Sequence, residues 1–415
     1  MKSQTEYRMC LYNQDSTIPT KDFSDANETC RYELTQWQEE LWSFFRIWIE
    51  VYGVIIISAL GLVFNFIAVI IFSHKDVPKN MFNRLLICLV IIDVLYLLIS
   101  IIETCISIYP TFETVFVFFF IIRLFRDIMM CAAIYMVVLL SFERSRVFSK
   151  ESGIVSALNS TNISWTDCLK PVVTIVLCSF FYKIPTIGEY TTETITTFDS
   201  NHTWCKGVTL FEKETSDEYG YITKTRITVT SWRSNYYYVL FNRTIADIFV
   251  TGIFPLILLL YFTYKIYLGK QVFLHRRKTI LQRHKKISVA SNNKTKNEIS
   301  QTITLFGIVI IFIICNLLRI LMRIGELINH NAQFEELEKG CMYKDQFWIL
   351  ILTPFSEFLL RLNSSVNFFI YWALNESFRS VIHFFTIRCL KKCGGSDSRN
   401  SDNLEVFEFR AVTKS

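Results

Sequence analysis

Polar side chains inside otherwise apolar segments are the residues of this sequence most able to do chemistry. Asp93 lies in the run LLICLVIIDVLYLL, which carries no other charged residue. A carboxylate in hydrocarbon costs roughly 2.5–3.5 kcal/mol, so we expect it to face other helices, water or a cation. The pattern indicates either a hydrogen-bonded contact between helices or a cation site. Similar apolar surroundings hold four further polar side chains: Asn65, Asn363, Ser364 and Asn367.

Arg144 is a second candidate, at the end of the apolar run LLSFERSRVF. The commoner use of such an arginine is to extend its head group to the membrane surface. It can also pair with a carboxylate and then release it to meet a partner, which is what a two-state switch requires. Both interpretations fit the residue and its position.

Ionisable residues also gather near the opposite ends of the apolar segments. Spacings of three and four residues place Arg123 with Arg126 and Asp127, and Glu357 with Arg361, on shared helix faces. Charged groups at that depth must line a wet cavity or neutralise one another. Five arginines accompany four acids in the second, third, sixth and seventh segments, so the balance does not reveal the charge of a ligand. The residues concerned are Glu103, Arg123, Arg126, Asp127, Arg319, Arg323, Glu326, Glu357 and Arg361, with Arg243 and Asp247 in the fifth segment.

The segments that carry these residues are long enough to cross a bilayer. Hydrophobic residues make up 51% of the 415 residues and aromatic residues 15%. They come in blocks of about 20, the length that a membrane-spanning helix needs. The sequence therefore predicts an all-α membrane protein, a bundle of seven transmembrane helices, although Lys183 and Pro185 interrupt the fourth. The predicted spans are residues 48–73, 81–105, 113–140, 169–188, 236–264, 300–325 and 346–373.

The distribution of charge predicts the orientation of the bundle. Between Lys265 and Glu298 ten basic residues accompany one acid, which favours the cytoplasmic side. The N-terminus and the loop 189–235 carry more acid than base, which suits the outside, and residues 1–41 contain no apolar segment typical of a cleavable signal peptide. The net charge of +6 reflects this topology, so we expect a lipid bilayer and no nucleic acid as a partner.

Several motifs resemble those of rhodopsin-like G-protein-coupled receptors. Asn367 to Tyr371 resembles the Asn-Pro-x-x-Tyr motif, with Phe368 in the place of the proline. Glu143-Arg144-Ser145 resembles the Asp/Glu-Arg-Tyr motif. Pro255 matches the proline of the fifth helix, and the run FIICNLLR is similar to Phe-x-x-Cys-x-x-Pro, with Leu318 replacing the proline.

Longer strings are similar to invertebrate neuropeptide receptors of the FMRFamide-receptor-like group. They include PVVTIVLCSFFYKIP, RSNYYYVLFNRTIADIFVTGIFPLILLLYFTYKIY and LNSSVNFFIYWALNESFR. This resemblance implies a plasma-membrane receptor with a peptide ligand and a heterotrimeric G protein as partners. It also implies that Glu298, at the start of the sixth span, tethers Arg144 until activation. The implied switch residues are Glu143, Arg144, Glu298, Asn367 and Tyr371.

The resemblance also implies a water and sodium cluster and a ligand pocket. Ala133 departs from the cluster, because the family often has serine there. Arg126 stands where an amine receptor has aspartate, and Arg361 where an opsin has the lysine of its Schiff base, so both classes are disfavoured. The cluster comprises Asn65, Asp93, Asn363, Ser364 and Asn367. The pocket comprises Glu103, Arg123, Arg126, Asp127, Arg319, Glu357 and Arg361.

The predicted domains follow from these assignments. Residues 1–47 form an extracellular tail, 48–373 the seven-helix domain, 374–393 an amphipathic eighth helix and 394–415 a cytoplasmic tail. Alternating residues at 203–210 and 221–230 predict a β-hairpin in the second extracellular loop.

Modification sites are predicted from position. Asn27 and Asn201 are glycosylation sequons on segments expected outside. Cys389 and Cys393 are candidates for palmitoylation, with reduced surface thiols as the alternative. Phe119 stands where the family commonly has a cysteine, so Cys205 needs another partner. Cys105 is one choice, and the sequence does not choose among the rest, Cys10, Cys30 and Cys341.

Three other classes of function are alternatives to a peptide receptor. A transporter or channel would use the intramembrane charges as a substrate path, but no internal repeat is visible. A receptor for a small non-peptide ligand would share the same fold. An enzyme is disfavoured, because the histidines are scattered and no His-Glu-x-x-His metal motif is present.

Overall fold

The computed structural model describes residues 34–75, 77–108, 113–149, 164–197, 212–216, 222–232, 235–283, 289–338 and 346–393. Within this part of the chain, six helices are long and apolar enough to cross a membrane, and one bent pair of helices brings the number to seven. The prediction of a helical, multi-pass membrane protein is therefore confirmed.

The first three spans are single long helices. The first joins α1 (Gln36–Phe45), the π-helical η2 (Arg46–Gly53) and α2 (Val54–Ser73). The next two are α3 (Met81–Ile108) and α4 (Glu113–Ser149). The helix of the first span begins before residue 48, where the span was predicted to start. Thr35 and Gln38 form a capping box that begins the helix at Gln36.

The later spans are more irregular. The fourth is α6 (Trp165–Lys183), followed by the 3₁₀-helix η4 (Ile184–Glu189). The fifth joins the π-helices η5 (Tyr238–Ile245) and η6 (Ile248–Ile253) to α7 (Phe254–Arg283). The sixth is α8 (Val289–Glu338), and the seventh is α9 (Phe347–Ser365) with α10 (Asn367–Leu374). A further helix, α11 (Glu376–Cys393), follows.

A small sheet lies between the fourth and fifth spans. Strands β1 (Tyr190–Thr197), β2 (Glu212–Ser216) and β3 (Ile222–Val229) are arranged in the order β1-β3-β2, with both pairs antiparallel. The predicted stretch 221–230 coincides with β3, but its predicted partner at 203–210 lies outside the described residues. Instead, β3 pairs with β1 and β2, so the arrangement differs from the simple hairpin that was expected.

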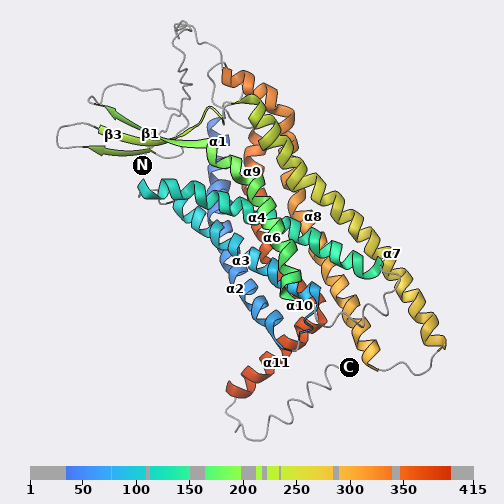
Figure 1. The fold of residues 1–415 in the computed structure, drawn as a ribbon. Helices are drawn as coiled ribbons and strands as arrows, with labels where there is room; N and C mark the ends of the chain where they lie inside the picture. Colours follow the sequence, from blue (N-terminus) through green and yellow to red (C-terminus); the bar gives the residue numbers. More distant parts are fainter. Residues whose placement is uncertain are drawn as a thin grey trace.

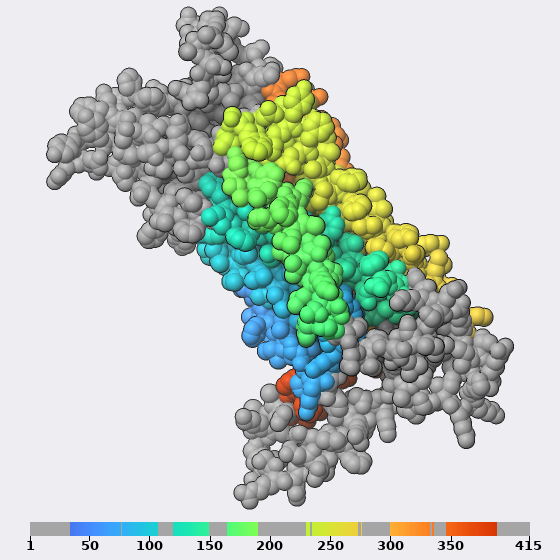
Figure 2. All heavy atoms as spheres, viewed as in Figure 1, coloured from blue at the N-terminus to red at the C-terminus, as the bar shows by residue number. Residues whose placement is uncertain are grey.

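The helices lie side by side in an elongated bundle (Figure 1). The strands lie at one end, here called the sheet end, and α11 lies at the other, the α11 end. On the face seen in Figure 2, α6 lies across α3 and α4. At 1.5 Å per residue the 50 residues of α8 extend for about 75 Å, well beyond the thickness of a bilayer.

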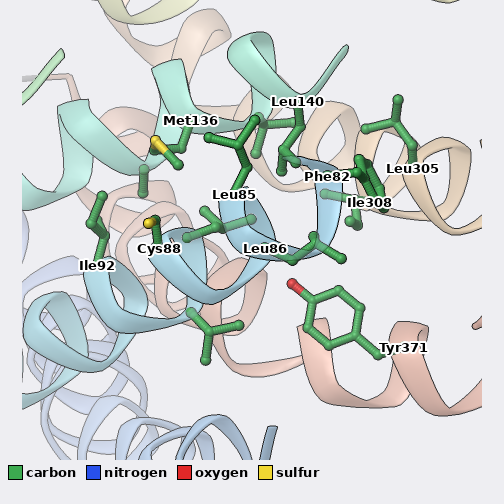
Figure 3. Close-up of a cluster of buried hydrophobic side chains, with 14 of the residues drawn as sticks. Phe82, Leu85, Leu86, Cys88, Ile92, Met136, Leu140, Leu305, Ile308 and Tyr371 are labelled. Carbon is green, nitrogen blue, oxygen red and sulfur yellow. The ribbon is translucent and has the colours of Figure 1, made fainter. Parts of the chain in front are cut away.

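Buried apolar side chains of α3, α4 and α8 fix the relative positions of these helices. Leu85, Met136 and Ile308 are almost fully buried and interdigitate with their neighbours (Figure 3). Tyr371 of α10 closes the cluster, and its hydroxyl end points toward Leu86 of α3. Because such interiors pack at crystal-like density, the polar groups that project from the same helices are held in defined places.

Backbone irregularity occurs in the fifth and seventh spans, as in η2 of the first span and η4 after the fourth, whereas α8 is a continuous helix through Leu318. The π-helix η6 ends just before Pro255, which has no N–H to donate to the preceding turn. The seventh span bends by 42° between α9 and α10. There the Ser365 hydroxyl donates 2.8 Å to the Arg361 carbonyl one turn earlier, a contact that often bends helices.

Candidate functional site

At the sheet end, Arg126 of α4 holds two carboxylates. Its Nη1 donates to Glu103 Oε2 of α3 at 2.6 Å, and its Nη2 and Nε donate to Asp127 Oδ1 at 2.7 and 3.0 Å. All three side chains are largely buried, so the charges neutralise each other in a poorly solvated place. The pairing joins α3 to α4 at the level of the predicted ligand pocket.

Asp247, between η5 and η6, is a second centre and receives three cations. Lys183 Nζ of α6 lies 2.9 Å from Oδ1, and Arg319 Nη2 and Arg323 Nε of α8 lie 3.0 and 3.3 Å from Oδ2. Asp247 is only 5% exposed. Lys183, which interrupts the fourth span in the sequence, is therefore accommodated by an ion pair with the fifth.

A small cavity adjoins this second centre. Asp247, Arg319 and Arg323 line it together with Asn316, and its volume of about 10 Å³ is room for about one water molecule. Asn316 donates to the Phe312 carbonyl at 2.8 Å, but its buried Oδ1 has no hydrogen-bond partner among the described residues. The cavity thus contains cationic donors and one unused acceptor.

The remaining predicted pocket residues are arranged around the seventh span. Glu357 and Arg361 of α9 form an ion pair one turn apart. Glu50 of η2 lies within electrostatic range of both and of Arg126. Arg123 of α4 is half-buried and, within the described part of the chain, forms no ion pair. The seven predicted pocket residues therefore do not form one network: Arg126 joins Glu103 and Asp127, Glu357 pairs with Arg361, Arg319 belongs to the Asp247 centre, and Arg123 stands apart.

Midway along the bundle, the predicted polar cluster is brought together in part. Asn367 Nδ2 donates to Asp93 Oδ2 at 2.8 Å, and Ser364 also contacts the Asp93 carboxylate. Asn65 Nδ2 donates to the Ser364 carbonyl at 2.8 Å, so α2, α3 and α9–α10 meet here. Asn363 is half-buried, and its side chain makes no hydrogen bond within the described residues.

Tyr371 lies one turn beyond Asn367. Its ring packs edge-on against Phe72 of α2 at 5.1 Å and against Phe378 of α11 at 5.8 Å. The buried hydroxyl has no hydrogen-bond partner among the described residues. The side chain therefore fixes the start of α11 against the bundle by packing.

At the α11 end, Arg144 of α4 is 2% exposed and Nη2 donates to Gln301 Oε1 of α8. The guanidinium carbon lies 3.9 Å from the centre of the Phe82 ring of α3. Glu143 pairs with Arg146 at 3.4 Å instead of with Arg144. Glu298, the predicted partner of Arg144, lies in α8, but its side chain is outside the described set.

A second contact at this end links α8 to the end of the seventh span. The Ser300 hydroxyl donates to the Leu374 carbonyl and accepts from the Glu376 N–H, both at 2.9 Å. Because Leu374 ends α10 and Glu376 begins α11, this hydroxyl joins the start of the sixth span to the turn that follows the seventh.

The predicted modification sites are mostly outside the described residues. This holds for Asn27 and Asn201, and for the side chains of Cys389 and Cys393, whose backbone belongs to α11. Cys105 is an exposed free thiol, so a bridge from Cys105 to Cys205 is not formed. The other three cysteines considered as partners, Cys10, Cys30 and Cys341, are also outside the described residues.

Comparison with known proteins identifies no relative: no protein-family model matches the chain, and no curated protein is significantly similar to it. Any function therefore has to be argued from the residues and their geometry.

Four residues of these contacts, Gln301, Asp247, Lys183 and Glu50, were not predicted as site residues from the sequence. Gln301 gave no signal, because a neutral amide near a helix start is common. Asp247 and Lys183 were visible as charges in apolar runs, and a search for opposite charges in neighbouring spans would have paired them. Glu50 was hidden because the first span was expected to begin only two residues earlier.

Proposed function

We propose that the chain is a rhodopsin-like G-protein-coupled receptor of the plasma membrane, which binds an FMRFamide-like peptide and activates a heterotrimeric G protein. The observation that carries the proposal is the contact of Arg144 with Gln301. A buried guanidinium of one spanning helix is held by a side chain of another, at the very end of the bundle. Such a contact can be exchanged for a protein partner, as a two-state switch requires.

In this proposal the α11 end is cytoplasmic. The part of α7 from Lys265 onward, the start of α8 and the residues between them carry the ten basic residues found between Lys265 and Glu298, which favours the inner side. The helix α11 is then the eighth helix and lies along the inner membrane surface. The N-terminus and the strands lie outside, where β1, β2 and β3 form part of a lid over the ligand entrance.

The sheet-end charges support a ligand that carries both signs. Around α3, α4 and α9, four carboxylates, Glu50, Glu103, Asp127 and Glu357, accompany three arginines, Arg123, Arg126 and Arg361. Around Asp247, cations predominate, because Lys183, Arg319 and Arg323 accompany only Asp247 and Glu326. A peptide with a cationic side chain and a carbonyl-rich end is complementary to this division.

The Asp93 cluster connects the two ends in this mechanism. It joins three spans at mid-depth through Asn367 and Asn65, next to the bend between α9 and α10. A sodium ion beside the carboxylate is proposed to stabilise the inactive arrangement, and an agonist shifts the equilibrium by its differential affinity for the active one.

The decisive experiment is a ligand screen that reads out the proposed partner. Cells that express the chain are exposed to a peptide library that includes amidated and free C-termini, and guanine-nucleotide exchange is measured on each G-protein class in their membranes. Exchange that depends on both the chain and one peptide supports the proposal. Absence of exchange with every peptide, together with solute flux in proteoliposomes of the purified chain, would replace it with the transporter alternative.

A further inference from the structure

The carboxamide of Gln301 forms hydrogen bonds that join α8 to α4 and to the start of α3. These contacts are here called the Gln301 junction. Gln301 is fully buried. Its Oε1 accepts from Arg144 of α4 and, at 3.2 Å, from Nδ2 of Asn80, just before α3. Its Nε2 donates to Asn83 Oδ1 at 3.4 Å. One neutral side chain of α8 thus contacts α4 through Arg144 and the start of α3 through Asn80 and Asn83.

The partners from the α3 start are themselves fixed. Asn80 Oδ1 accepts from the Asn83 N–H at 3.0 Å, and Asn83 Nδ2 donates to the Pro78 carbonyl at 2.8 Å. Between them, Phe82 covers the Arg144 guanidinium with its ring. Arg144 is therefore enclosed by Phe82 on one side and Gln301 on another, and both are held by hydrogen-bonded residues at the start of α3.

The chemistry of the junction suits an amide better than an acid. Oε1 receives two donors, whereas Nε2 faces an acceptor on Asn83. A carboxylate at position 301 would keep the first two contacts and gain attraction to Arg144, but it would meet Asn83 Oδ1 with a lone pair in place of a donor. Glutamine is the residue that satisfies both sides.

We infer that Gln301 is the positioning residue that holds Arg144 in the closed arrangement, through a neutral hydrogen-bond junction that includes Asn80 and Asn83. The role of the junction in activation rests on the proposed function, whereas its hydrogen bonds do not. Activation then requires the start of α8 to leave Asn80 and Asn83 as well as Arg144. A G protein gains access to Arg144 only after this junction opens.

A fluorine probe can measure the opening without relying on signalling. Ile303 of α8 is 39% exposed and lies close in sequence to Gln301, so a genetically encoded trifluoromethyl-phenylalanine at position 303 reports the environment of this helix end by ¹⁹F NMR without modifying native cysteines. The purified full-length chain is compared as wild type, Gln301→Met, Gln301→Glu and Arg144→Ala, with ligand-free nucleotide exchange measured in parallel.

Gln301→Met keeps the volume of the side chain and removes both polar groups, so it should raise the open-to-closed ratio on the order of tenfold, the usual effect of losing a hydrogen bond to a charged group. Gln301→Glu should give a ratio between those of the wild type and Gln301→Met, because it retains the acceptor for Arg144 but loses the donor to Asn83 Oδ1. Arg144→Ala should open the helix end yet give no exchange. If Gln301→Met does not fold, Asn80→Ala removes one donor from outside α8 and should open the junction to a lesser degree.

The outcomes separate the inference from the proposed function. An unchanged ¹⁹F spectrum in Gln301→Met and Asn80→Ala overturns the role of Gln301, above all if Glu298→Gln opens the helix end instead. Opening in Gln301→Met without nucleotide exchange from any G-protein class, in any variant and with any peptide, leaves the junction intact as a finding and counts against the receptor function.

Discussion

Lys183 Nζ lies 2.9 Å from Asp247 Oδ1, which joins the end of the fourth span to the middle of the π-helical part of the fifth. The same carboxylate also receives Arg319 and Arg323 from the sixth span. Three spans are thus held together by one buried acidic group, and the packing of the sheet end depends on it.

Replacing Asp247 by asparagine should therefore destabilise the protein severely. The substitution leaves the buried Lys183 and Arg319 without their carboxylate and Arg323 with Glu326 alone, and removal of one partner from a buried ion pair typically costs about 3–5 kcal/mol. We expect a large fall in the thermal unfolding midpoint of the detergent-solubilised chain, and reduced surface expression. Asp167→Asn is the matched control, because Asp167 is 60% exposed and lies 3.9 Å from Lys170. Equal midpoints for the two variants would show that the Asp247 centre is not structural.

Close approach of the first and seventh spans gives a second prediction. A Cβ at Gly61 would overlap with Ser365 Oγ and lie 2.8 Å from Leu97 Cδ1. Gly61→Ala should lower stability by about 1–3 kcal/mol through overpacking, more than the gain in helix propensity. Gly188→Ala, whose Cβ would meet Trp232 at an ordinary 3.4 Å, should leave the unfolding midpoint unchanged. Because Ser365→Gly also removes the hydrogen bonds of Ser365 to Arg361 and Ile57, the test is a double-mutant cycle: Gly61→Ala should cost less in a Ser365→Gly background than in the wild type, and an equal cost in both backgrounds would argue against this contact.

The contacts that could be predicted from the sequence either lie within one helical turn or involve a buried charge that must have a polar partner. Glu357 and Arg361 are one helical turn apart, so their pairing follows from the period of the helix alone. Asp93 is isolated in hydrocarbon and needed a polar partner from another span, and the amides of the seventh span were the nearest match in type.

Contacts that depend on the rotation and depth of one helix against another were beyond sequence reasoning. Lys183 and Asp247 are 64 residues apart, and only the packing of α6 on the fifth span brings them together. Gln301 and Arg144 are 157 residues apart, and a shift of α8 by one turn would place a different side chain beside Arg144. The bend at Val366 likewise arises from side-chain hydrogen bonds of serine, not from a proline.

The proposed sodium site can be tested without a ligand. Asp93→Asn keeps an acceptor for Asn367 Nδ2 but removes the negative charge that would attract a cation. The unfolding midpoint of the wild type should rise when sodium chloride replaces choline chloride at equal ionic strength; sodium at ten times its dissociation constant stabilises by about 1.4 kcal/mol. The Asp93→Asn variant should show no rise. A sodium effect of equal size in both proteins, or none in the wild type, would rule out this site.

Substitutions of Arg123 and Arg126 should distinguish a residue that binds the ligand from one that stabilises the fold. The two arginines are neighbours on α4 but have different surroundings. Arg126 bonds two carboxylates, so Arg126→Gln should lower the unfolding midpoint and surface expression. Arg123 is half-buried and, among the described residues, has no ion pair, so Arg123→Gln should leave both unchanged. Once a peptide agonist is found, Arg123→Gln should reduce its potency roughly tenfold, the effect of losing one charge-assisted hydrogen bond. Concentration–response curves normalised to surface expression provide the measurement. Unaltered potency would remove Arg123 from the pocket, and a midpoint as low as that of Arg126→Gln would assign it to the scaffold.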